Sequence, residues 1–432
     1  ERAMTKESLS HYNNGVELLA RVPAGRARDT LELRLQMDRG PLLMPLTGNG
    51  SQAVHDSFAR ALELSRTLNA RADRFPILFG LRSHALASGD ISKAHELSLE
   101  LNHIAHQSDD PGQLLEAHTA LANTSFFRGD FVEVENEAKA AMTIYDPNRF
   151  RNHVHIYGTD PGVLCLSRLS IAAWQRAKVD RGRFHLLEMI SLAETLNHAF
   201  TLASALNLAA LVRLWRCEPQ DAFNYAERSV TLSEKHAFPF PAAWGQMLRG
   251  RALIELSNNS DGLEQILDGF EKTKKLSAKL MEPWFIAILV DAKIRQQHIV
   301  DAAELLSHAF RIVAESGTTY SLPSLHCLKG ELLLESPTAF GGNDTALQSF
   351  VASANIARRH GSRAMELRAR VGTVAASKDG SARTNYLAQM RDVLAFFRRG
   401  DDSKDILAAL ALVDGGDQDN VGALSSEPNT LS

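Results

Sequence analysis

A chain of 432 residues exceeds the roughly 250–300 residues that one hydrophobic core supports, so we expect several domains or an elongated array. Hydrophobic residues make up 44% of the chain and charged residues 23%, as in ordinary globular proteins. The formal net charge of -4 and the lack of long basic clusters argue against a surface that binds nucleic acid. No apolar run reaches the roughly 18 residues of a membrane-spanning helix, and no signal peptide is recognisable. We expect a cytoplasmic protein that binds neither nucleic acid nor membrane.

The three cysteines, Cys165, Cys217 and Cys327, are far apart in apolar surroundings. Such a set forms neither a disulfide framework nor a zinc-binding pair, so we expect buried free thiols and no cofactor. The chain begins at Glu1, and its first methionine, Met4, already lies in an expected helix. We therefore expect a fragment or a processed product.

Residues 1–70 are expected to form N-terminal helices that join a longer array. The first carries Leu9, Tyr12 and Val16 at helical spacing. A second is expected over 30–43. A third begins at residue 51, after a loop at 45–50 that contains proline and glycine.

From residue 71 onward, pairs of helices recur about every 40 residues, a period typical of helical repeats. Asp130 is an expected N-cap, and Glu133 stands at the capping-box position. The second helices of successive pairs are expected to begin near residues 90, 130, 181, 219, 261, 299, 343 and 381. Because proline is favoured at the start of a helix, a set of prolines supports this phasing: Pro76, Pro111, Pro161, Pro219, Pro241, Pro283 and Pro323.

Small residues recur where these helices would cross, among them Ala138, Ala141 and Ala302. This pattern resembles tetratricopeptide repeats, although the period is longer and the regular aromatic positions are missing. It predicts an all-α fold: an α-solenoid of tetratricopeptide-like helical hairpins in a right-handed superhelix over residues 71–413. A short helix at 406–413 should cap the array. The tail at 414–432, rich in Gly, Asp, Asn and Ser, is expected to be disordered.

An inserted loop at 145–163 lengthens the interval between the second and third of these hairpins. Loops with this content of His, Arg and aromatic residues are often functional. Contact with a partner or another domain, binding of a ligand or metal, and simple packing of the loop all stay open. The candidate binding residues in the loop are Arg149, Arg151, His153, His155, Tyr157 and Asp160.

Catalytic motifs are missing from the sequence. It contains no Gly-Lys dipeptide for a P-loop, no G-x-S-x-G, no H-E-x-x-H and no C-x-x-C. His95, His103 and His106 share one face of an expected helix and could hold a metal, but a solvated helix face is the simpler interpretation. We predict no catalytic and no metal-binding residue, and a metal-dependent enzyme built on the loop histidines is disfavoured.

Solenoids bind partners on the surface that their curvature creates. Polar and aromatic residues of the first helices are expected there: Glu116, Asn123, Asn207, Trp215, Asp291 and Arg295. Trp215, flanked by Arg213 and Arg216, is the best single anchor, because Trp and Arg dominate binding hot spots. Core packing of this tryptophan, with both arginines solvated, is the alternative.

Several stretches resemble the C-terminal region of bacterial adenylate/guanylate cyclase–ATPase fusion proteins, a type of signal-transduction ATPase. They include YDP at 145–147, HIYGTDPGVLCLS at 155–167, FPFPAAWGQMLRGRAL at 238–253 and KGELLL at 329–334. The resemblance runs from about residue 5 to 413. One departure is Lys178–Val179–Asp180, where relatives usually carry a Gly-Tyr-Pro turn.

In that family a cyclase domain or a winged helix precedes an ATPase, and a tetratricopeptide array follows. The resemblance implies a regulatory arm, and it places the ATPase and cyclase residues upstream of Glu1. We expect a non-catalytic sensor and protein-interaction module of a signalling ATPase or cyclase-type protein. It would bind a protein partner, a linked effector domain or a small ligand on the superhelix. The alternative is a free-standing tetratricopeptide scaffold that assembles partners without any ATPase.

Overall fold

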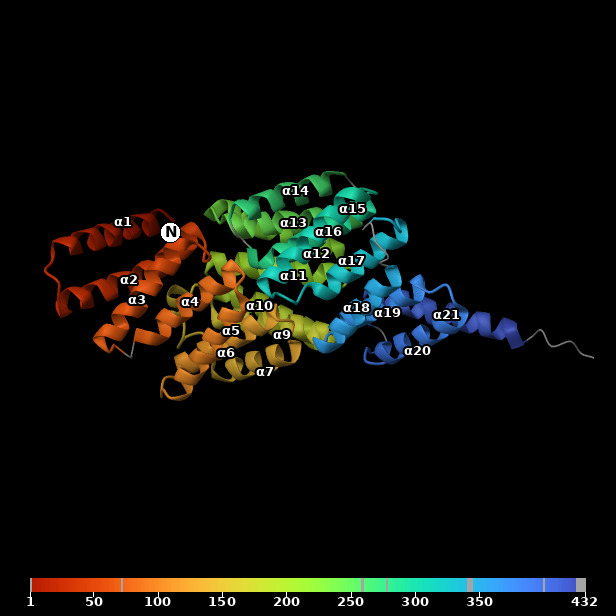
Figure 1. The fold of residues 1–432 in the computed structure, drawn as a ribbon, viewed down its shortest axis with the longest axis horizontal. Helices are drawn as coiled ribbons and strands as arrows, with labels where there is room; N and C mark the ends of the chain where they lie inside the picture. Colours follow the sequence, from red (N-terminus) through yellow and green to blue (C-terminus); the bar gives the residue numbers. More distant parts are fainter. Residues whose placement is uncertain are drawn as a thin grey trace, which may run out of the picture.

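The computed structural model describes residues 2–70, 73–257, 260–276, 279–339, 345–398 and 401–424. Within these ranges the chain is helical and has no strand, and consecutive helices pack as pairs. The predicted α-solenoid is therefore confirmed. Figure 1 shows the array with α1 to α4 at one end and α18 to α21 at the other.

Three N-terminal helices open the array: α1 (Arg2–Leu18), α2 (Arg26–Thr47) and α3 (Gln52–Leu68). The second helix is longer than predicted, because it continues past residue 43 to Thr47. It ends where Gly48 takes a φ of 86°, a conformation that favours glycine.

Eight helical hairpins follow in the described ranges. They are α4 (Arg74–Ser88) with α5 (Ile91–His106), α6 (Pro111–Phe127) with α7 (Phe131–Ile144), α9 (Pro161–Gln175) with α10 (Val179–Thr195), α11 (Ala199–Trp215) with α12 (Pro219–His236), α13 (Pro239–Ser257) with α14 (Ser260–Lys275), α15 (Glu282–Arg295) with α16 (Ile299–Ser316), α17 (Leu322–Glu335) with α18 (Ala346–Arg359), and α19 (Arg363–Ala376) with α20 (Gly380–Leu394). Each second helix begins close to its predicted residue.

Helix caps explain this agreement. Asp130 accepts a hydrogen bond from the backbone N–H of Glu133 at 3.0 Å, as predicted for an N-cap. The Glu133 carboxylate does not complete a capping box. It accepts instead from the hydroxyl of Ser125 at 2.6 Å, which ties α7 to the end of α6.

Alanines allow the helices to pack closely. Ala138, Ala141, Ala222 and Ala302 have no exposed surface, as the small-residue pattern predicts. The core is a series of apolar clusters along the array, because each hairpin buries its apolar face against its neighbours.

The hairpin of α9 and α10 forms although its turn departs from the family pattern. Lys178 donates from Nζ to both carboxylate oxygens of Glu135, at 2.9 and 2.8 Å, and so ties this turn to α7. Burial alone would raise the pKa of Glu135, but hydrogen bonds from Lys139 and Lys178 and the charge of Arg176 lower it to about 2.

The last helix, α21 (Lys404–Leu424), is longer than expected. Residues 414–424 were predicted to be disordered, and they are helical. The glycines at 415 and 416 lower helix propensity by about 1 kcal/mol each, but glycine, unlike proline, has the backbone N–H group that a helix requires. No proline stops the helix before Pro428. The remaining part of that expected tail, 425–432, lies outside the described residues.

The superhelix also closes on itself. The backbone N–H groups of Thr319 and Tyr320 donate to the carbonyl of Phe127 at 3.1 and 3.3 Å. The Thr319 hydroxyl donates to the carbonyl of Arg128 at 2.5 Å. The turn between α6 and α7 is thereby joined to the turn between α16 and α17, far away in the sequence.

Other turns continue this line of contacts, which we call the seam. The N–H of Phe131 donates to the carbonyl of His360 at 3.3 Å. The seam also includes the pairs Ser362–Gln175 at 2.5 Å, Arg398–Asp180 at 2.6 Å and Arg216–Asp402 at 3.4 Å. Turns of the first half of the array therefore contact turns of the second half.

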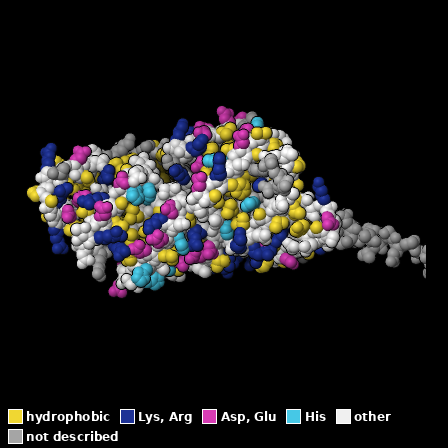
Figure 2. Space-filling view, viewed as in Figure 1, with side chains coloured by type: hydrophobic (Ala, Val, Ile, Leu, Met, Phe, Trp, Pro, Cys, Tyr) yellow, Lys and Arg dark blue, Asp and Glu magenta, His cyan; other side chains and the backbone are white. Residues whose placement is uncertain are grey.

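Positive and negative side chains are interspersed on the face of the molecule in Figure 2. Among the described residues, no helix combines the length and apolar composition needed to span a membrane.

Candidate functional site

The extra residues that interrupt the repeat form a short inserted segment, residues 145–160. Its first turn is held by Asp146, whose carboxylate accepts from the backbone N–H groups of Asn148 and Arg149 at 2.8 and 3.2 Å. A single helix, α8 (His153–Tyr157), follows and ends at Gly158, where φ is 82°. This helix contacts α2 and α4, so the segment crosses to the first helices of earlier pairs.

A buried acid–imidazole pair fixes α8 to α6. Nδ1 of His153 lies 2.7 Å from Oε1 of Glu116, with 14% and 2% of the two side chains exposed. Burial raises the pKa of Glu116, whereas the hydrogen bond with His153 and the charge of Arg82 oppose this shift. A buried carboxylate is stable only with such partners, so this pair is a strong constraint on where α8 lies.

An aromatic contact fixes the other end of α8 to α4. The ring of Tyr157 meets Phe79 and Phe75 edge-on, with centroids 4.6 and 6.4 Å apart. Burial raises the pKa of Tyr157. His153 and Tyr157 are four residues apart and lie on one side of the helix, so α8 presents both anchors to the array.

The base of the inserted segment is closed by its own residues. The hydroxyl of Tyr145 donates to the carboxylate of Asp160, with both oxygens at 3.1 Å. Asp160 is also the N-cap of α9 and accepts from the N–H of Val163 at 2.9 Å. Only 2% of Asp160 is exposed, and its carboxylate is engaged in these contacts. A role of Asp160 in binding stays a prediction.

The other candidates in the segment are differently placed. Arg149 and Arg151 are exposed, and the guanidinium of Arg149 lies 5.2 Å from the ring centroid of Phe150. Phe150 is buried, although it was not among the predicted contact residues. The side chain of His155 lies outside the described residues. The segment therefore packs through Phe150, His153 and Tyr157 and leaves its arginines accessible.

Residues expected to face an open groove are largely engaged with the protein itself. Asn207 has no exposed surface and donates from Nδ2 to the carbonyl of Pro241 at 2.8 Å. The carboxamide oxygen of Asn123 accepts from Arg168 at 2.7 Å. We expected these polar side chains to be free to bind a partner. In the structure they bond to groups of the neighbouring first helix, because the first helices of successive pairs lie close together.

The Trp215 cluster is similarly engaged. The indole is half-buried and packs against three apolar clusters. The arginines beside it are not solvated: Arg216 is 4% exposed and donates to Glu218 at 3.0 Å, and Arg213 also pairs with Glu218. A role in partner binding for this cluster stays a prediction.

Asp291 and Arg295, the remaining predicted binding residues, belong to a network of charged side chains on the first helices. The carboxylate of Asp291 lies 2.5 Å from Arg251 and 3.5 Å from Arg295. Burial alone would raise the pKa of Asp291, but the charges of these two arginines lower it. The network therefore consists of paired charges.

The described residues also form two pockets that the sequence did not reveal. One, of about 410 Å³, lies between the N-terminal helices and α8; its lining includes Tyr12, Met37, Leu42, Pro76 and Ile156. Its wall is thus partly built by the inserted segment. The hydroxyl of Tyr12 donates to Asp38 at 3.3 Å at the same place.

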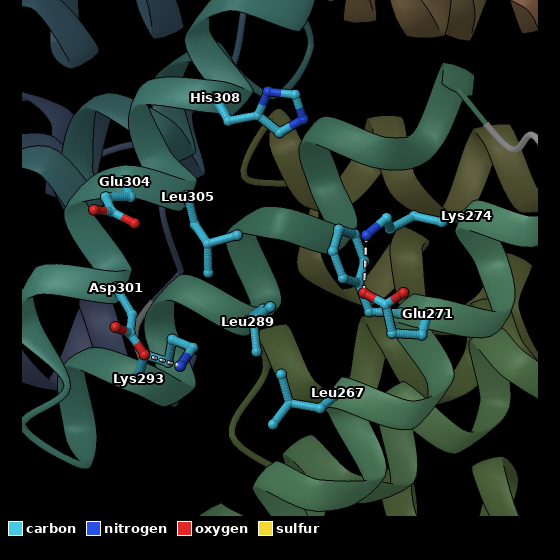
Figure 3. A pocket seen from close by; sticks show the side chains of 10 residues that line it. Leu267, Glu271, Lys274, Leu289, Lys293, Asp301, Glu304, Leu305 and His308 are labelled. Atoms are coloured by element: carbon cyan, nitrogen blue, oxygen red, sulfur yellow. Dashed lines mark hydrogen bonds and ion pairs between the residues drawn. The ribbon is translucent and has the colours of Figure 1, made fainter.

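The other pocket, of about 380 Å³, is a groove between α14 and α16 with α15 as its floor. Figure 3 shows leucines in its centre, Asp301 and Glu304 on one side and Lys274 on the other. Lys293 pairs with Asp301 at 2.6 Å.

Among the described residues, no group of three or more His, Cys, Asp or Glu side chains is placed to hold a metal ion. The three cysteines are free thiols, with Cys165 and Cys327 buried and Cys217 half-buried.

No protein-family model matches the chain. An uncharacterized protein of Rhizobium meliloti (strain 1021) is 20% identical over 372 residues, which are 85% of this chain and 36% of that protein. The chain therefore spans about a third of the length of this curated relative.

One solved structure shares this fold, and a second resembles it more weakly. A Rap protein complexed with Competence and Sporulation Factor is 12% identical, covers 78% of this chain and 100% of its own, and has a TM-score of 0.51. A Signal Transduction ATPase with Numerous Domains protein with a tetratricopeptide repeat sensor, from Pyrococcus horikoshii, is 11% identical. It covers 90% of this chain and 54% of its own, with a TM-score of 0.45. The chain is a tetratricopeptide-like helical repeat protein in its fold.

Proposed function

We propose that this chain is a non-catalytic sensor and interaction arm of a signalling ATPase or cyclase-type protein. It binds a protein partner or a small ligand on the first-helix surface and thereby controls a linked effector domain. The observation that carries this proposal is the surface of α4 and α6, which already accommodates a short helix through side chains. The backbone bonds of that segment, from His153 to Phe150 and from Gly158 to Val154, are local.

Two further observations support the linked effector. The stretches at 155–167 and 238–253 resemble the region that follows the ATPase in cyclase–ATPase fusion proteins. The Rhizobium meliloti relative is about three times as long as the segment that it shares with this chain, so an array of this kind stands beside other sequence there.

The seam suggests how binding is transmitted. Its contacts join turns of two halves of the array, and a ligand that fits only one arrangement of the halves shifts their equilibrium. Gly89 lies in the turn between α4 and α5, and a β-carbon there would be 3.5 Å from Cβ of Ser316, three residues before Thr319 of the seam. This distance suits a disulfide, although the φ of 90° at Gly89 strains any substitution there. The variant Gly89→Cys/Ser316→Cys can therefore lock the seam in the oxidised state and free it on reduction.

The experiment begins with the DNA upstream of Glu1, read in frame. A Gly-Lys-Ser/Thr loop in that frame supports the proposal, whereas a start codon directly before Glu1 favours a free-standing scaffold. Nucleotide turnover of the full-length product is then compared with that of the same product lacking residues 1–432, and with the seam locked and freed. Turnover by the isolated 1–432 chain, or identical turnover in all forms, contradicts the proposal.

A further inference from the structure

The surface beneath α8 combines an aromatic floor with a buried acid. Phe75 and Phe79 from α4 are 1% and 6% exposed, and Glu116 from α6 is 1% exposed. Arg82 lies beside them, but its Nη1 donates to the carbonyl of Ala120 at 3.1 Å. The imidazole of His153 is the hydrogen-bond partner of the Glu116 carboxylate. This surface therefore matches an aromatic ring together with a cation.

The helix that covers this surface is held in place by a few side chains. One turn of helix has little stability by itself, because helix nucleation is unfavourable. Its described anchors are the side chains of Phe150, His153 and Tyr157, and 47% of Ile156 is exposed. The bond between Tyr145 and Asp160 joins the two ends of the segment. Phe150 packs with Ala138 of α7 and Leu169 of α9, so we expect Phe150 to stay in place when α8 leaves.

The neighbouring pocket extends the same surface. Ile156 lies at this pocket of about 410 Å³, together with Met37, Leu42 and Pro76. Asp38, also in the lining, is exposed and adds a negative charge. An aliphatic side chain that precedes the aromatic one would therefore find an apolar recess and an acidic rim.

We infer that the surface of α4 and α6 is a docking site for a partner helix, and that α8 occupies it until the partner displaces it. The partner segment carries a basic residue, an aliphatic residue three positions later and an aromatic residue directly after that. It reproduces the arrangement of His153, Ile156 and Tyr157. This inference rests on the proposed interaction function and specifies the chemistry of its partner.

The probe is a fluorescein-labelled peptide of residues 145–160. It has the sequence of the inserted segment itself and is added as a separate molecule. It is titrated into the wild-type chain and into the release variant His153→Ala/Tyr157→Ala, with anisotropy as the readout. We expect at least about tenfold tighter binding to the release variant, because apparent affinity falls with the fraction of open surface. The peptide that itself carries His153→Ala and Tyr157→Ala should bind neither protein.

Two controls keep the test decisive. Tyr157→Phe keeps the ring and should bind the peptide as weakly as the wild type does. A second release variant replaces residues 151–158 by a glycine–serine linker, keeps the buried Phe150, and should bind as the first does. Circular dichroism melting confirms that each protein is folded.

The position of the bound peptide is read from a photo-crosslinker placed at its Tyr157. Crosslinks to α4 support the inference, whereas crosslinks elsewhere overturn it. Equal binding to wild type and to both folded release variants, or no binding to either variant, also overturns it. If the peptide binds as expected but turnover of the linked effector does not respond, the docking site stands and the proposed sensor function fails.

Discussion

The seam and the inserted segment both join distant parts of the array, but they do so by different means. The seam combines side-chain pairs, such as Ser362–Gln175, with backbone bonds, such as those from Thr319 and Tyr320 to the carbonyl of Phe127. The inserted segment uses the side chains of His153 and Tyr157. A backbone hydrogen bond forms only when the two turns hold one relative position, whereas the side-chain contacts of α8 can be made by a helix of another molecule. The comparison indicates that the seam sets the shape of the superhelix and that the segment is the exchangeable part.

The largest effect should come from the seam glycine at position 129. Gly129 has a φ of 76°, and a β-carbon there would lie 2.6 Å from the ring of His360. Gly129→Ala should lower the free energy of unfolding by about 2–4 kcal/mol, from the unfavourable φ and the clash together. Urea unfolding measures this change.

Gly158→Ala is the matched control in the inserted segment. Its φ is 82°, but a β-carbon there would meet nothing within 4 Å. We expect only the conformational part of the effect, about 1–2 kcal/mol. Equal effects of the two substitutions would mean that the seam is not tightly packed at His360.

The next largest effect is expected from acidification, through protonation of His360 in the seam. Burial and the charge of Arg359 lower the pKa of His360 to about 4, below its ordinary value of 6.5. The unfolded chain then binds the proton more readily, so stability is present above pH 6.5 and lost as the pH falls toward 4. The loss should be about 2–3 kcal/mol, or less with partial exposure of the ring.

The variant His360→Asn isolates this contribution. Melting temperatures of wild type and variant are compared between pH 7 and pH 4. The variant should lose less stability over this range than the wild type. Parallel curves for the two proteins would assign the acid sensitivity to other groups.

Release of α8 should have a smaller effect on global stability. In His153→Ala/Tyr157→Ala, the segment loses its anchors while the helices of the array keep theirs. Trypsin should cut at the exposed Arg149 and Arg151 at least about tenfold faster, because cleavage follows the population of the open form. The global free energy of unfolding should fall by no more than about 2 kcal/mol. Unfolding of the whole array in this variant would show that the segment is part of its core.

The smallest effect is expected in the groove of Figure 3. Lys274 and Glu271 form an ion pair at 2.8 Å, with 46% and 57% of the side chains exposed. Glu271→Ala should change the free energy of unfolding by less than about 0.5 kcal/mol, since water and salt screen exposed pairs. A loss above about 1 kcal/mol would show that this exposed ion pair contributes as much to stability as a buried pair such as Glu116–His153, contrary to our expectation.

The helices could be predicted from the sequence because their signals are local. Asp130 and the prolines at positions 111, 161 and 219 mark helix starts by rules that need no tertiary contact. The position of the inserted segment was likewise visible as a break in the repeat. Both kinds of signal are present in the sequence itself and need no knowledge of which helices meet in space.

The seam and the pairing of the inner polar groups could not be predicted in the same way. No local pattern indicates that Thr319 meets Arg128, or that Asn207 is buried against the carbonyl of Pro241. Both depend on how far each hairpin rotates relative to the last, and small rotations accumulate along the array. The burial of His153 on Glu116 depends on the same rotations.

The seam also fixes the number of hairpins in one turn of the superhelix. Its side-chain contacts join residues that are 186, 187, 191 and 218 positions apart. With hairpins of about 40 residues, one turn of the superhelix therefore contains about five of them. Most repeat proteins can gain or lose a unit during evolution, because each unit touches only its neighbours. Here an added hairpin between residues 131 and 360 would bring every turn opposite the wrong partner, so changes in repeat number should be confined to the ends of the array.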